Sequence, residues 1–309
     1  MKIITLTLNP AFDIHCYTPN FAPYHENLAR ITDRDASGKG VNISRALTVR
    51  GIENLAVVVL GDENGEDFSR LLDADALNYR AITVSGRIRE NITLHTDGAN
   101  ETRISFEGFL ADDRLLDEVL SVIEEYPLDG AIVTFTGRAA TGLSMGRIKE
   151  FLRALRSMGA RIVIDSKSFT LDDIIEVKPY LIKPNQEEIS EYLGRAITDF
   201  SEVRAAAEEL YRVGIENVMI SLGAEGALLV CADGSYVAVP PKIDALSTIG
   251  AGDSTVAGFI SVADSARDGG DRLRMAVAYG TAACLTSGTR PPRREDVDTV
   301  YEGVSVRKI

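Results

Sequence analysis

The stretch STIGAGDSTVAGFI, residues 247–260, places a turn of small residues directly before a predicted helix. Gly250, Ala251 and Gly252 have little or no side chain, so an anionic group can approach their backbone N–H groups closely. The unpaired N–H groups and the positive dipole end of a helix both attract phosphate. Asp253 follows at the start of the same helix, where a carboxylate suits a base that takes a proton from an attacking hydroxyl. The stretch therefore predicts a kinase.

An alternative interpretation of this stretch stays open. Aspartate is a favoured residue at helix starts, and a Gly-x-Gly turn is by itself weak evidence for a ligand site. The stretch contains neither the GxxxxGK[ST] pattern of a P-loop nor the full GxGxxG of a dinucleotide fold. Support for a kinase must therefore come from other segments of the chain.

Composition limits the class of protein. The chain has 309 residues, of which 45% are hydrophobic and 26% charged, as expected for one large α/β domain. Its formal net charge of -13 excludes a general binder of nucleic acid or membrane surfaces, because both are anionic. The three cysteines and three histidines are scattered, which indicates neither a disulfide framework nor a metal site. Without a signal peptide or an apolar stretch of membrane-spanning length, we expect a cytoplasmic protein.

Helices and strands are predicted to alternate along most of the chain. Such alternation is typical of right-handed βαβ units and predicts an α/β fold, with a doubly wound, mostly parallel sheet and helices on both faces. The expected strands are 2–8, 55–61, 130–135, 161–165, 180–183, 217–222, 226–231 and 235–239. The expected helices lie within 36–51, 64–73, 112–125, 141–157, 170–176, 186–193, 201–213, 250–265, 271–287 and 294–302.

Short strand candidates fall outside this alternation, and we expect them to form a small sheet that covers one mouth of the larger one. They are found at 14–36, 80–84, 91–96 and 102–106. The chain is thus expected to be a single ribokinase-like domain, residues 1–309, with lid strands inserted at about 14–36 and 86–108.

Polar residues of the N-terminal third could bind a substrate at this mouth. Asp13 follows the first strand, at the edge where ligands bind in α/β sheets, although a turn aspartate fits the same position. Lys39 and Asn42 lie at the opening end of a helix and suit sugar hydroxyls or phosphate, whereas a solvated lysine is the plain alternative. Arginines of the lid, Arg89 among them, suit a phosphorylated substrate or an exposed polar face.

Five motifs together resemble the PfkB group of the ribokinase family. The resemblance runs from residue 3 to about residue 290, and within the group the opening TLTLNPAFD is most similar to the 1-phosphofructokinases and tagatose-6-phosphate kinases. Several motifs in register are far more specific than any one of them. The motifs are LNPAFD at the start, ASGKGVN at 36–42, IKPNQEEISEYLG at 182–194, SLGAEGALL at 221–229, and STIGAGDSTVAGFI.

The resemblance implies roles for the residues of the donor side. Asp253 matches the catalytic base of the family, and the backbone of Gly250, Ala251 and Gly252 matches its anion hole. Further residues match positions that hold ATP and its Mg²⁺, the metal being ordered through water by an Asn-x-x-Glu motif. These are Asn185 and Glu188 for the metal, Lys183 for nucleotide phosphate, Ser221, Gly223 and Gly226 for the loop that lines the nucleotide, and Ser287 beside the adenine.

The resemblance also implies an acceptor site and a mode of assembly. Arg89 matches an arginine that reaches the existing phosphate of the substrate in phosphosugar kinases. The covering strands match a lid through which many members dimerise, so a homodimer is expected. The residues that match sugar-contacting positions are Asp13, Gly38, Lys39 and Asn42.

Departures from the family pattern fall on the acceptor side. Ser37 stands where the family has a glycine, and the loop FTGRAATG at 135–142 replaces SGSLPPG, so that Arg138 occupies the place of a small polar residue. Leu28 stands where phosphofructokinases often carry a basic residue. Our hypothesis is that Arg138 compensates for Leu28 by binding the phosphate of the sugar, and the alternative is a solvated arginine.

The resemblance thus implies an ATP- and magnesium-dependent carbohydrate kinase that acts on a sugar phosphate. Fructose 1-phosphate is the first expected acceptor, giving fructose 1,6-bisphosphate, and tagatose 6-phosphate or fructose 6-phosphate is the nearest alternative. More distant alternatives are a kinase of an unphosphorylated sugar or nucleoside, and a non-catalytic sugar sensor on a kinase scaffold.

Overall fold

Strand β1 (Ile3–Thr7) lies in the interior of the fold, and all five of its residues are buried. It pairs in parallel with β4 (Asn54–Gly61) on one side and with β8 (Ile132–Thr136) on the other. Strands that are buried on both faces form continuous apolar runs, as in the segment LAVVVLG of β4. The computed structural model describes residues 3–97 and 101–309.

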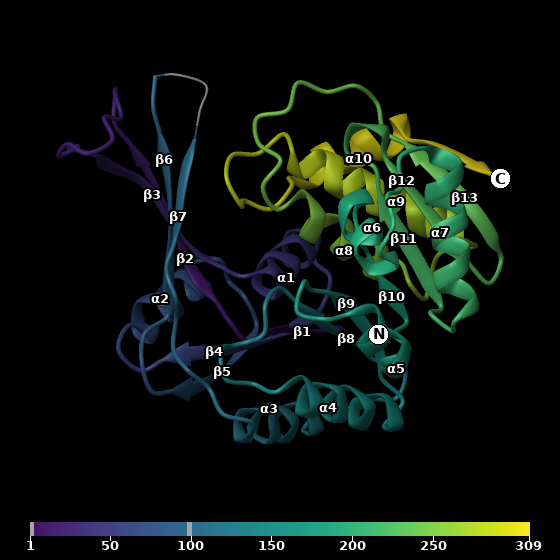
Figure 1. Cartoon of the computed structure of the whole chain (residues 1–309), viewed down its shortest axis with the longest axis horizontal. Coiled ribbons are helices and arrows are strands. Elements are labelled where there is room, and N and C mark those ends of the chain that lie inside the picture. The colour runs from purple at the N-terminus through teal and green to yellow at the C-terminus, as the bar shows by residue number, and fades with distance from the viewer. Residues whose placement is uncertain (1–2, 98–100) are drawn as a thin grey trace.

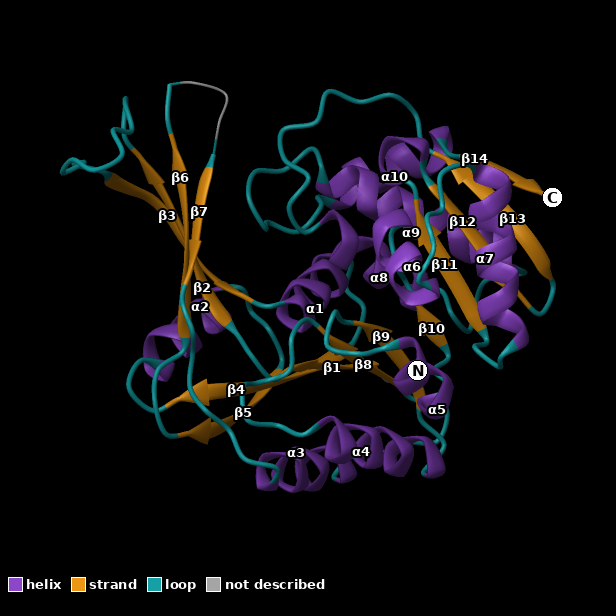
Figure 2. Cartoon of the chain, viewed as in Figure 1, coloured by secondary structure: helices purple, strands orange, loops and turns teal. Residues whose placement is uncertain are grey.

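Ten strands form the large sheet, in the order β14-β13-β12-β11-β10-β9-β8-β1-β4-β5 (Figures 1 and 2). The strands from β5 to β11 are parallel, and β12, β13 and β14 add an antiparallel edge. The remaining members are β5 (Tyr79–Val84), β9 (Arg161–Asp165), β10 (Leu181–Ile182), β11 (Asn217–Ser221), β12 (Ala227–Cys231), β13 (Gly234–Val239) and β14 (Ser305–Lys308).

Helices cover both faces of this sheet, and each face has its own apolar core. One face packs against α2 (Gly65–Ala74), α3 (Arg114–Glu124), α4 (Met145–Ser157), α5 (Leu171–Val177), α6 (Gln186–Leu193) and α7 (Phe200–Arg212). The other packs against α1 (Lys39–Val49), α8 (Ala251–Ser261), α9 (Gly269–Ala283) and α10 (Arg294–Gly303). The predicted doubly wound fold is thereby confirmed. Among the described residues, no helix combines the length and apolar character needed to cross a bilayer.

Helix α1 lies unusually close to β1, because its first turn contains glycine. A Cβ atom on Gly40 would overlap the carbonyl oxygen of Leu6. The hydroxyl Oγ1 of Thr7 accepts a hydrogen bond from the N–H of Val41 at 3.0 Å, which fixes the start of the helix. The preceding Gly38 has a φ of +144° and also leaves no room for a side chain beside Thr7. The first turn of α1 is therefore held at the carboxyl end of β1.

A separate four-stranded sheet, the lid, stands beside the large sheet (Figure 1). Its strand order is β3 (Arg30–Ser37), β2 (Ala11–Tyr17), β6 (Arg89–His95) and β7 (Thr102–Ser105). At the base of the lid, the ring of Phe12 packs edge to face on Phe68 of α2, with 5.2 Å between ring centroids. The guanidinium of Arg34 lies 4.1 Å from the centre of the same Phe12 ring.

The assignment of residues 80–84 to the small sheet was wrong. They form β5, which pairs in parallel with β4 at the edge of the large sheet. The reason is that β4, α2 and β5 make one right-handed βαβ unit, in which consecutive parallel strands become neighbours. The short final strand β14 was not predicted, because its sequence SVRK is mostly exposed and has no apolar pattern strong enough to mark a strand.

Candidate active site

The glycine turn before α8 has the geometry of an anion site. Gly250 adopts the left-handed conformation with φ +77°, and α8 begins at the next residue. No described side chain caps this helix, and the N–H of Ala251 donates to the carbonyl of Thr248 at 3.4 Å, which leaves the N–H groups of Gly252 and Asp253 for a ligand. The turn lies at the carboxyl edge of the sheet, where ligands bind in doubly wound folds.

Asp253, in the first turn of α8, is buried with 7% of its surface exposed. Its Oδ2 atom accepts a hydrogen bond of 2.9 Å from the amide nitrogen Nδ2 of Asn42 in α1. Burial raises the pKa of Asp253 to about 6, against the opposing influence of the Lys39 ammonium and the Asn42 amide. A carboxyl group with a pKa near neutrality is well matched to general-base catalysis.

Asp165 was not among the residues predicted from the sequence, yet it lies in the middle of the site. It is the last residue of β9, and its carboxylate is within 2.9 Å of the Lys39 ammonium and 3.7 Å of the Lys183 ammonium. Burial alone would raise the pKa of Asp165, but Lys183 and Lys39 outweigh it and hold that pKa below its ordinary value. Asp165 is thus a charged carboxylate that fixes two lysines.

Lys183 follows β10 and points at the glycine turn. Its side chain is only 7% exposed, which excludes the interpretation as a solvated surface lysine. A Cβ atom added to Gly252 would lie 3.3 Å from the Lys183 ammonium nitrogen. A cation therefore faces the backbone of the predicted anion hole. The pKa of Lys39 is raised, because the attraction of Asp165 and Asp253 outweighs the effect of burial.

Asn185 and Glu188 form a capping box at the start of α6. The N–H of Glu188 donates to Asn185 Oδ1 at 2.8 Å, and the N–H of Asn185 donates to Glu188 Oε2 at 3.0 Å. Lys167 places its ammonium 3.6 Å from the other Glu188 oxygen. The immediate contacts of this motif are therefore structural.

The donor set agrees with a metal held through water and substrate phosphates. In the described part of the chain, no three acidic, histidine or cysteine side chains gather to ligate an ion directly. Mg²⁺ often keeps several waters and few protein ligands, so Asp165 and Glu188, both partly occupied by lysines, fit that mode. The assignment of Asn185 and Glu188 to the metal stays a prediction.

The segment after β11 lies beside the Asn185 motif. The N–H of Ser221 donates to the carbonyl of Pro184 at 3.0 Å, and Asn185 and Ser221 form an isolated parallel bridge. Gly223 has a φ of +61° and open space where a side chain would be. Gly226, with φ +93°, has a different reason to be glycine, because a Cβ atom there would overlap the carbonyl oxygen of Ala238.

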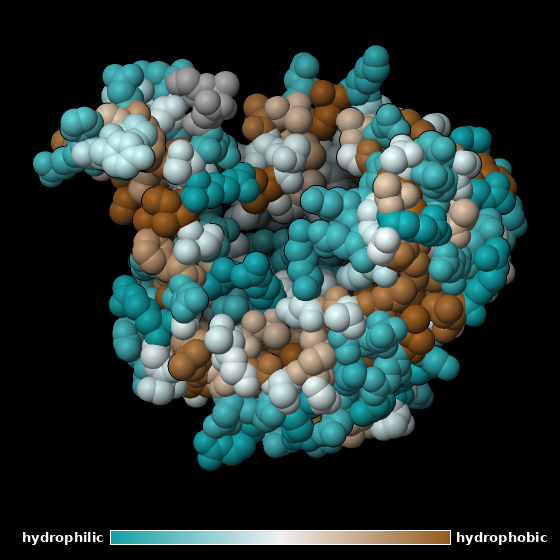
Figure 3. All heavy atoms as spheres, in the orientation of Figure 1, coloured by the Kyte–Doolittle hydropathy of each residue, from teal (hydrophilic) through white to brown (hydrophobic). Residues whose placement is uncertain are grey.

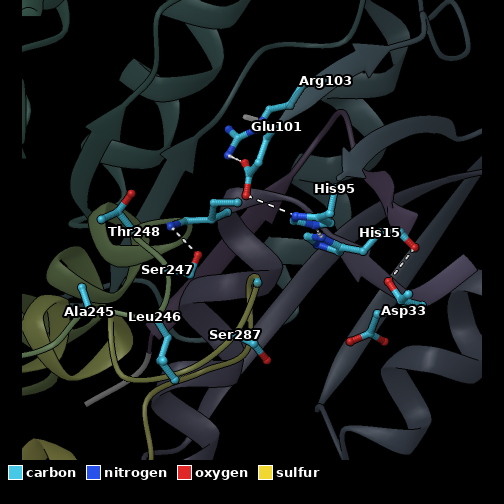
Figure 4. A pocket seen from close by; sticks show the side chains of 13 residues that line it. His15, Asp33, His95, Glu101, Arg103, Ala245, Leu246, Ser247, Thr248 and Ser287 are labelled. Carbon is cyan, nitrogen blue, oxygen red and sulfur yellow. Dashed lines mark hydrogen bonds and ion pairs between the residues drawn. The ribbon is translucent and has the colours of Figure 1, made fainter. Parts of the chain in front are cut away.

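Ser287 lies in the segment that follows α9 and faces the lid. It lines a cavity of about 560 Å³ together with the lid histidines His15 and His95 (Figure 4). The opposite wall is the segment 245–249 that leads to the glycine turn. The position of Ser287 beside the adenine stays a prediction.

Three of the acceptor residues predicted from the sequence lie together at the base of the lid, namely Asp13, Arg89 and Arg138. Asp13 of β2 accepts a hydrogen bond of 2.9 Å from Asn91 of β6, a neighbour that was not predicted. Arg89 begins β6, and its buried Nε atom has no hydrogen-bond partner among the described residues. Burial lowers the pKa of Arg89; the charge of Asp13 opposes this shift, and that of Arg138 adds to it. Arg138 is itself exposed, on the segment after β8.

The structure thus brings the predicted residues together in two sets, and Lys39 and Asn42, predicted to contact the sugar, belong to the set of Asp253. A space-filling view shows a hollow between the lid and the body of the molecule (Figure 3). Asp253, Lys39, Asn42 and Lys183 gather at the carboxyl edge of the sheet. Asp13, Arg89 and Arg138 gather at the base of the lid.

This chain is similar to known proteins both in sequence and in structure. The family described as pfkB family carbohydrate kinase matches residues 7–296. A 1-phosphofructokinase of Escherichia coli (strain K12) is 34% identical over 290 residues, which are 93% of this chain and 92% of that protein. The ATP-dependent 6-phosphofructokinase isozyme 2 of the same strain is 30% identical and covers 99% of both chains. A crystal structure of phosphofructokinase-2 from Escherichia coli in complex with substrates and products has a TM-score of 0.92 at 28% identity, covering 98% of this chain and 99% of that one.

The charge arrangement predicts the titration of Asp253. Carbon-13 NMR of the aspartate carboxyls, assigned with Asp253→Asn, should show this group protonated below and ionised above a pH of about 6. In Asp165→Asn the pKa should fall, because the negative charge of Asp165 raises it. Asp117→Asn, which removes an exposed partner of Arg147, should leave it unchanged. An Asp253 pKa that rises in Asp165→Asn would contradict this assignment.

Proposed function

Since the chain belongs to the pfkB family of carbohydrate kinases, we propose that it transfers the γ-phosphoryl group of ATP to fructose 1-phosphate. The product would be fructose 1,6-bisphosphate. The observation that carries this proposal is the buried Asp253 carboxylate at an uncapped helix start, with two lysines beside it. Arg89 of the lid and the neighbouring Arg138 are proposed to contact the same bound substrate.

Asp253 acts as the base for the acceptor hydroxyl. The oxygen that attacks the γ-phosphorus loses its proton to the Asp253 carboxylate, while the bond from phosphorus to the bridging oxygen of ADP breaks. Asn42 donates to one carboxylate oxygen at 2.9 Å and so fixes the plane of the carboxylate. The other oxygen is left to receive the proton.

The transferring phosphoryl group is stabilised by fixed positive charge. Lys183 faces Gly252, and the first N–H groups of α8 lie at the positive end of the helix dipole. Asp165 keeps the Lys183 and Lys39 ammonium groups at this point, and so acts as a positioning residue. Such preorganised charge requires no rearrangement when the reaction occurs.

Magnesium completes the donor side in this proposal. When bound, it would neutralise the oxygens of the β- and γ-phosphates. Glu188, Asn185 and Asp165 would hold it, with waters in between, since none of these side chains is free of protein contacts.

Arg89 and Arg138 are proposed to bind the existing phosphate of the acceptor. Arg89 offers a buried donor without a partner, which is costly unless a ligand accepts from it. Arg138 lies close enough to act on the pKa of Arg89, and such proximity of two cations favours an anion between them. Fructose 6-phosphate and tagatose 6-phosphate stay as alternatives, because one relative is named a 6-phosphofructokinase.

Replacing the base separates an enzyme from a sugar sensor. Asp253→Asn should lower kcat by roughly 10²- to 10⁴-fold, the usual contribution of a general base. ATP binding, measured by calorimetry, should persist because the amide keeps the shape of the side chain. In the unchanged protein, kcat/KM for the acceptor should fall as the pH drops below about 6, where Asp253 becomes protonated. Turnover that survives this substitution would refute the proposed role.

The phosphate site predicts a change in KM. Arg138→Ala should raise the KM for fructose 1-phosphate about tenfold or more, as expected when a charge-assisted hydrogen bond is lost. Turnover of unphosphorylated fructose should not change. Arg114→Ala is the matched control, because its guanidinium pairs with Asp112 on an exposed helix start. If Arg138→Ala and this control give the same KM, Arg138 is only a solvated arginine.

The lid is also proposed to join two copies of the chain. Side chains of its outer face include Ile31 and Ile104, which are 65% and 46% exposed, and Phe106 follows at 50%. The register of β2, β6 and β7 places Ile14, Ile92 and Ile104 on that same face. A second copy would bury this apolar surface.

Charge on the outer face should break the homodimer. Ile104→Glu together with Ile31→Glu should give monomers in sedimentation velocity at concentrations where the unchanged chain is dimeric. Val213→Glu, at a similarly exposed valine that ends α7, should leave the oligomer intact. A monomeric unchanged chain would overturn the proposed dimer.

A further inference from the structure

Strand β3 of the lid is fastened on both of its faces. Neighbouring residues of a strand point to opposite faces, and Asp33 and Arg34 follow this rule. Arg34 lies over the Phe12 ring and 3.8 Å from Asp67 of α2. Asp33 instead accepts from the guanidinium of Arg290 at 2.9 Å, although 257 residues separate the two in sequence.

The partner of Asp33 belongs to the segment between α9 and α10. Within it, the hydroxyl of Thr286 donates to the carbonyl of Arg290 at 2.8 Å, and the N–H of Arg290 points back to the carbonyl of Ser287 at 3.4 Å. These bonds close a tight turn, residues 286–290. A second lid residue lies close to this turn, since a Cβ atom added to Gly288 would lie 3.4 Å from Nε2 of His15, and both residues line the same cavity. His15 pairs with Asp33 across β2 and β3 and lies on the same face (Figure 4).

The turn 286–290 also supports the glycine turn of the active site. Thr289 is buried, and its Cα atom would lie 3.7 Å from a Cβ atom on Gly250. The N–H of Leu246 donates to the carbonyl of Cys284 at 2.8 Å, which ties the segment leading to Gly250 to the same loop. The turn that Arg290 joins to the lid therefore packs next to the predicted anion hole, with the backbone of Thr289 beside Gly250.

We infer that Asp33 and Arg290 are a positioning pair that couples the lid to the anion hole of the proposed kinase. When the lid covers the acceptor, the pair holds the turn 286–290, and Thr289 in turn holds Gly250 where the phosphoryl group passes. The inference rests on the proposed function only in treating the turn at Gly250 as an anion hole. The physical link between lid and turn stands on the contacts alone.

Stability does not explain this pair. The side chains of Asp33 and Arg290 are 37% and 60% exposed, and exposed ion pairs contribute little to the free energy of unfolding. Their effect is to join β3 to the turn 286–290. Among the described residues, no other ion pair connects these two segments. We therefore expect local effects on the turn and on the reaction, with an unchanged melting temperature.

The test uses the full-length chain and two readouts. Asp33→Asn and Arg290→Gln should each speed hydrogen exchange of the amides in 286–292 by about two- to fivefold, the range that an exposed pair allows. They should also lower kcat with the sugar phosphate by a similar factor. Both effects should shrink at high ionic strength, because salt screens exposed charges.

Two further variants test whether the ion pair of Asp33 and Arg290 itself causes both effects. The exchanged pair Asp33→Arg with Arg290→Asp should restore both readouts. Arg293→Gln, which removes an exposed pair with Asp296 three residues further on, should change neither. Unchanged hydrogen exchange in Asp33→Asn overturns the inference whether or not the chain phosphorylates a sugar. Faster exchange with an unchanged kcat also overturns it, since the turn would then be irrelevant to the anion hole.

Discussion

The site depends on the pairing of one buried carboxylate with two ammonium groups. Burying an isolated charge costs several kcal/mol, and the neighbouring Lys183 and Lys39 ammonium groups offset this cost for Asp165, whose pKa they hold below its ordinary value. The Lys39 ammonium is the second positive charge beside Asp165. Two ammonium groups are thereby held beside a helix start, in a chain whose overall net charge is -13.

The large sheet brings these charges together. Asp165 ends β9, Lys183 directly follows β10, and Lys39 begins the helix packed on β1. These strands are parallel, so their carboxyl ends meet at one edge although the residues are far apart in sequence. The tight glycine contact between α1 and β1 is what delivers Lys39 and Asn42 to this edge.

The residues proposed to bind the acceptor come in part from the lid, which is a separate four-stranded sheet. Its inner face carries polar residues such as Asp13, Asn91 and Asp33, and its outer face carries apolar ones. This alternation is ordinary for a sheet with two different environments. Here it places the residues proposed to bind the acceptor on one face of the lid and an apolar surface on the other.

Much of this arrangement could be predicted from the sequence, and the exceptions have physical reasons. Apolar runs and glycine turns predicted the large sheet and the anion hole. Asp165 ends the apolar run RIVID, so the reasoning that selected Asp13 at a strand end would also have selected it. The role of β5 could not be separated from that of the lid strands, since all are short and β-rich. The Asp33 contact with Arg290 depends on the placement of the lid, which no local pattern encodes.

The junction between the lid and the large sheet has a mechanical consequence. Strand β3 ends at Ser37, helix α1 begins at Lys39, and only Gly38 stands between them. Its φ of +144° makes it a pivot that few other residues could replace. Lys39 therefore lies one residue from the lid, while Asp165 of the large sheet holds its ammonium group. In the proposed kinase, the lid that covers the sugar and the lysine beside the transferred phosphate are thus joined through a single glycine.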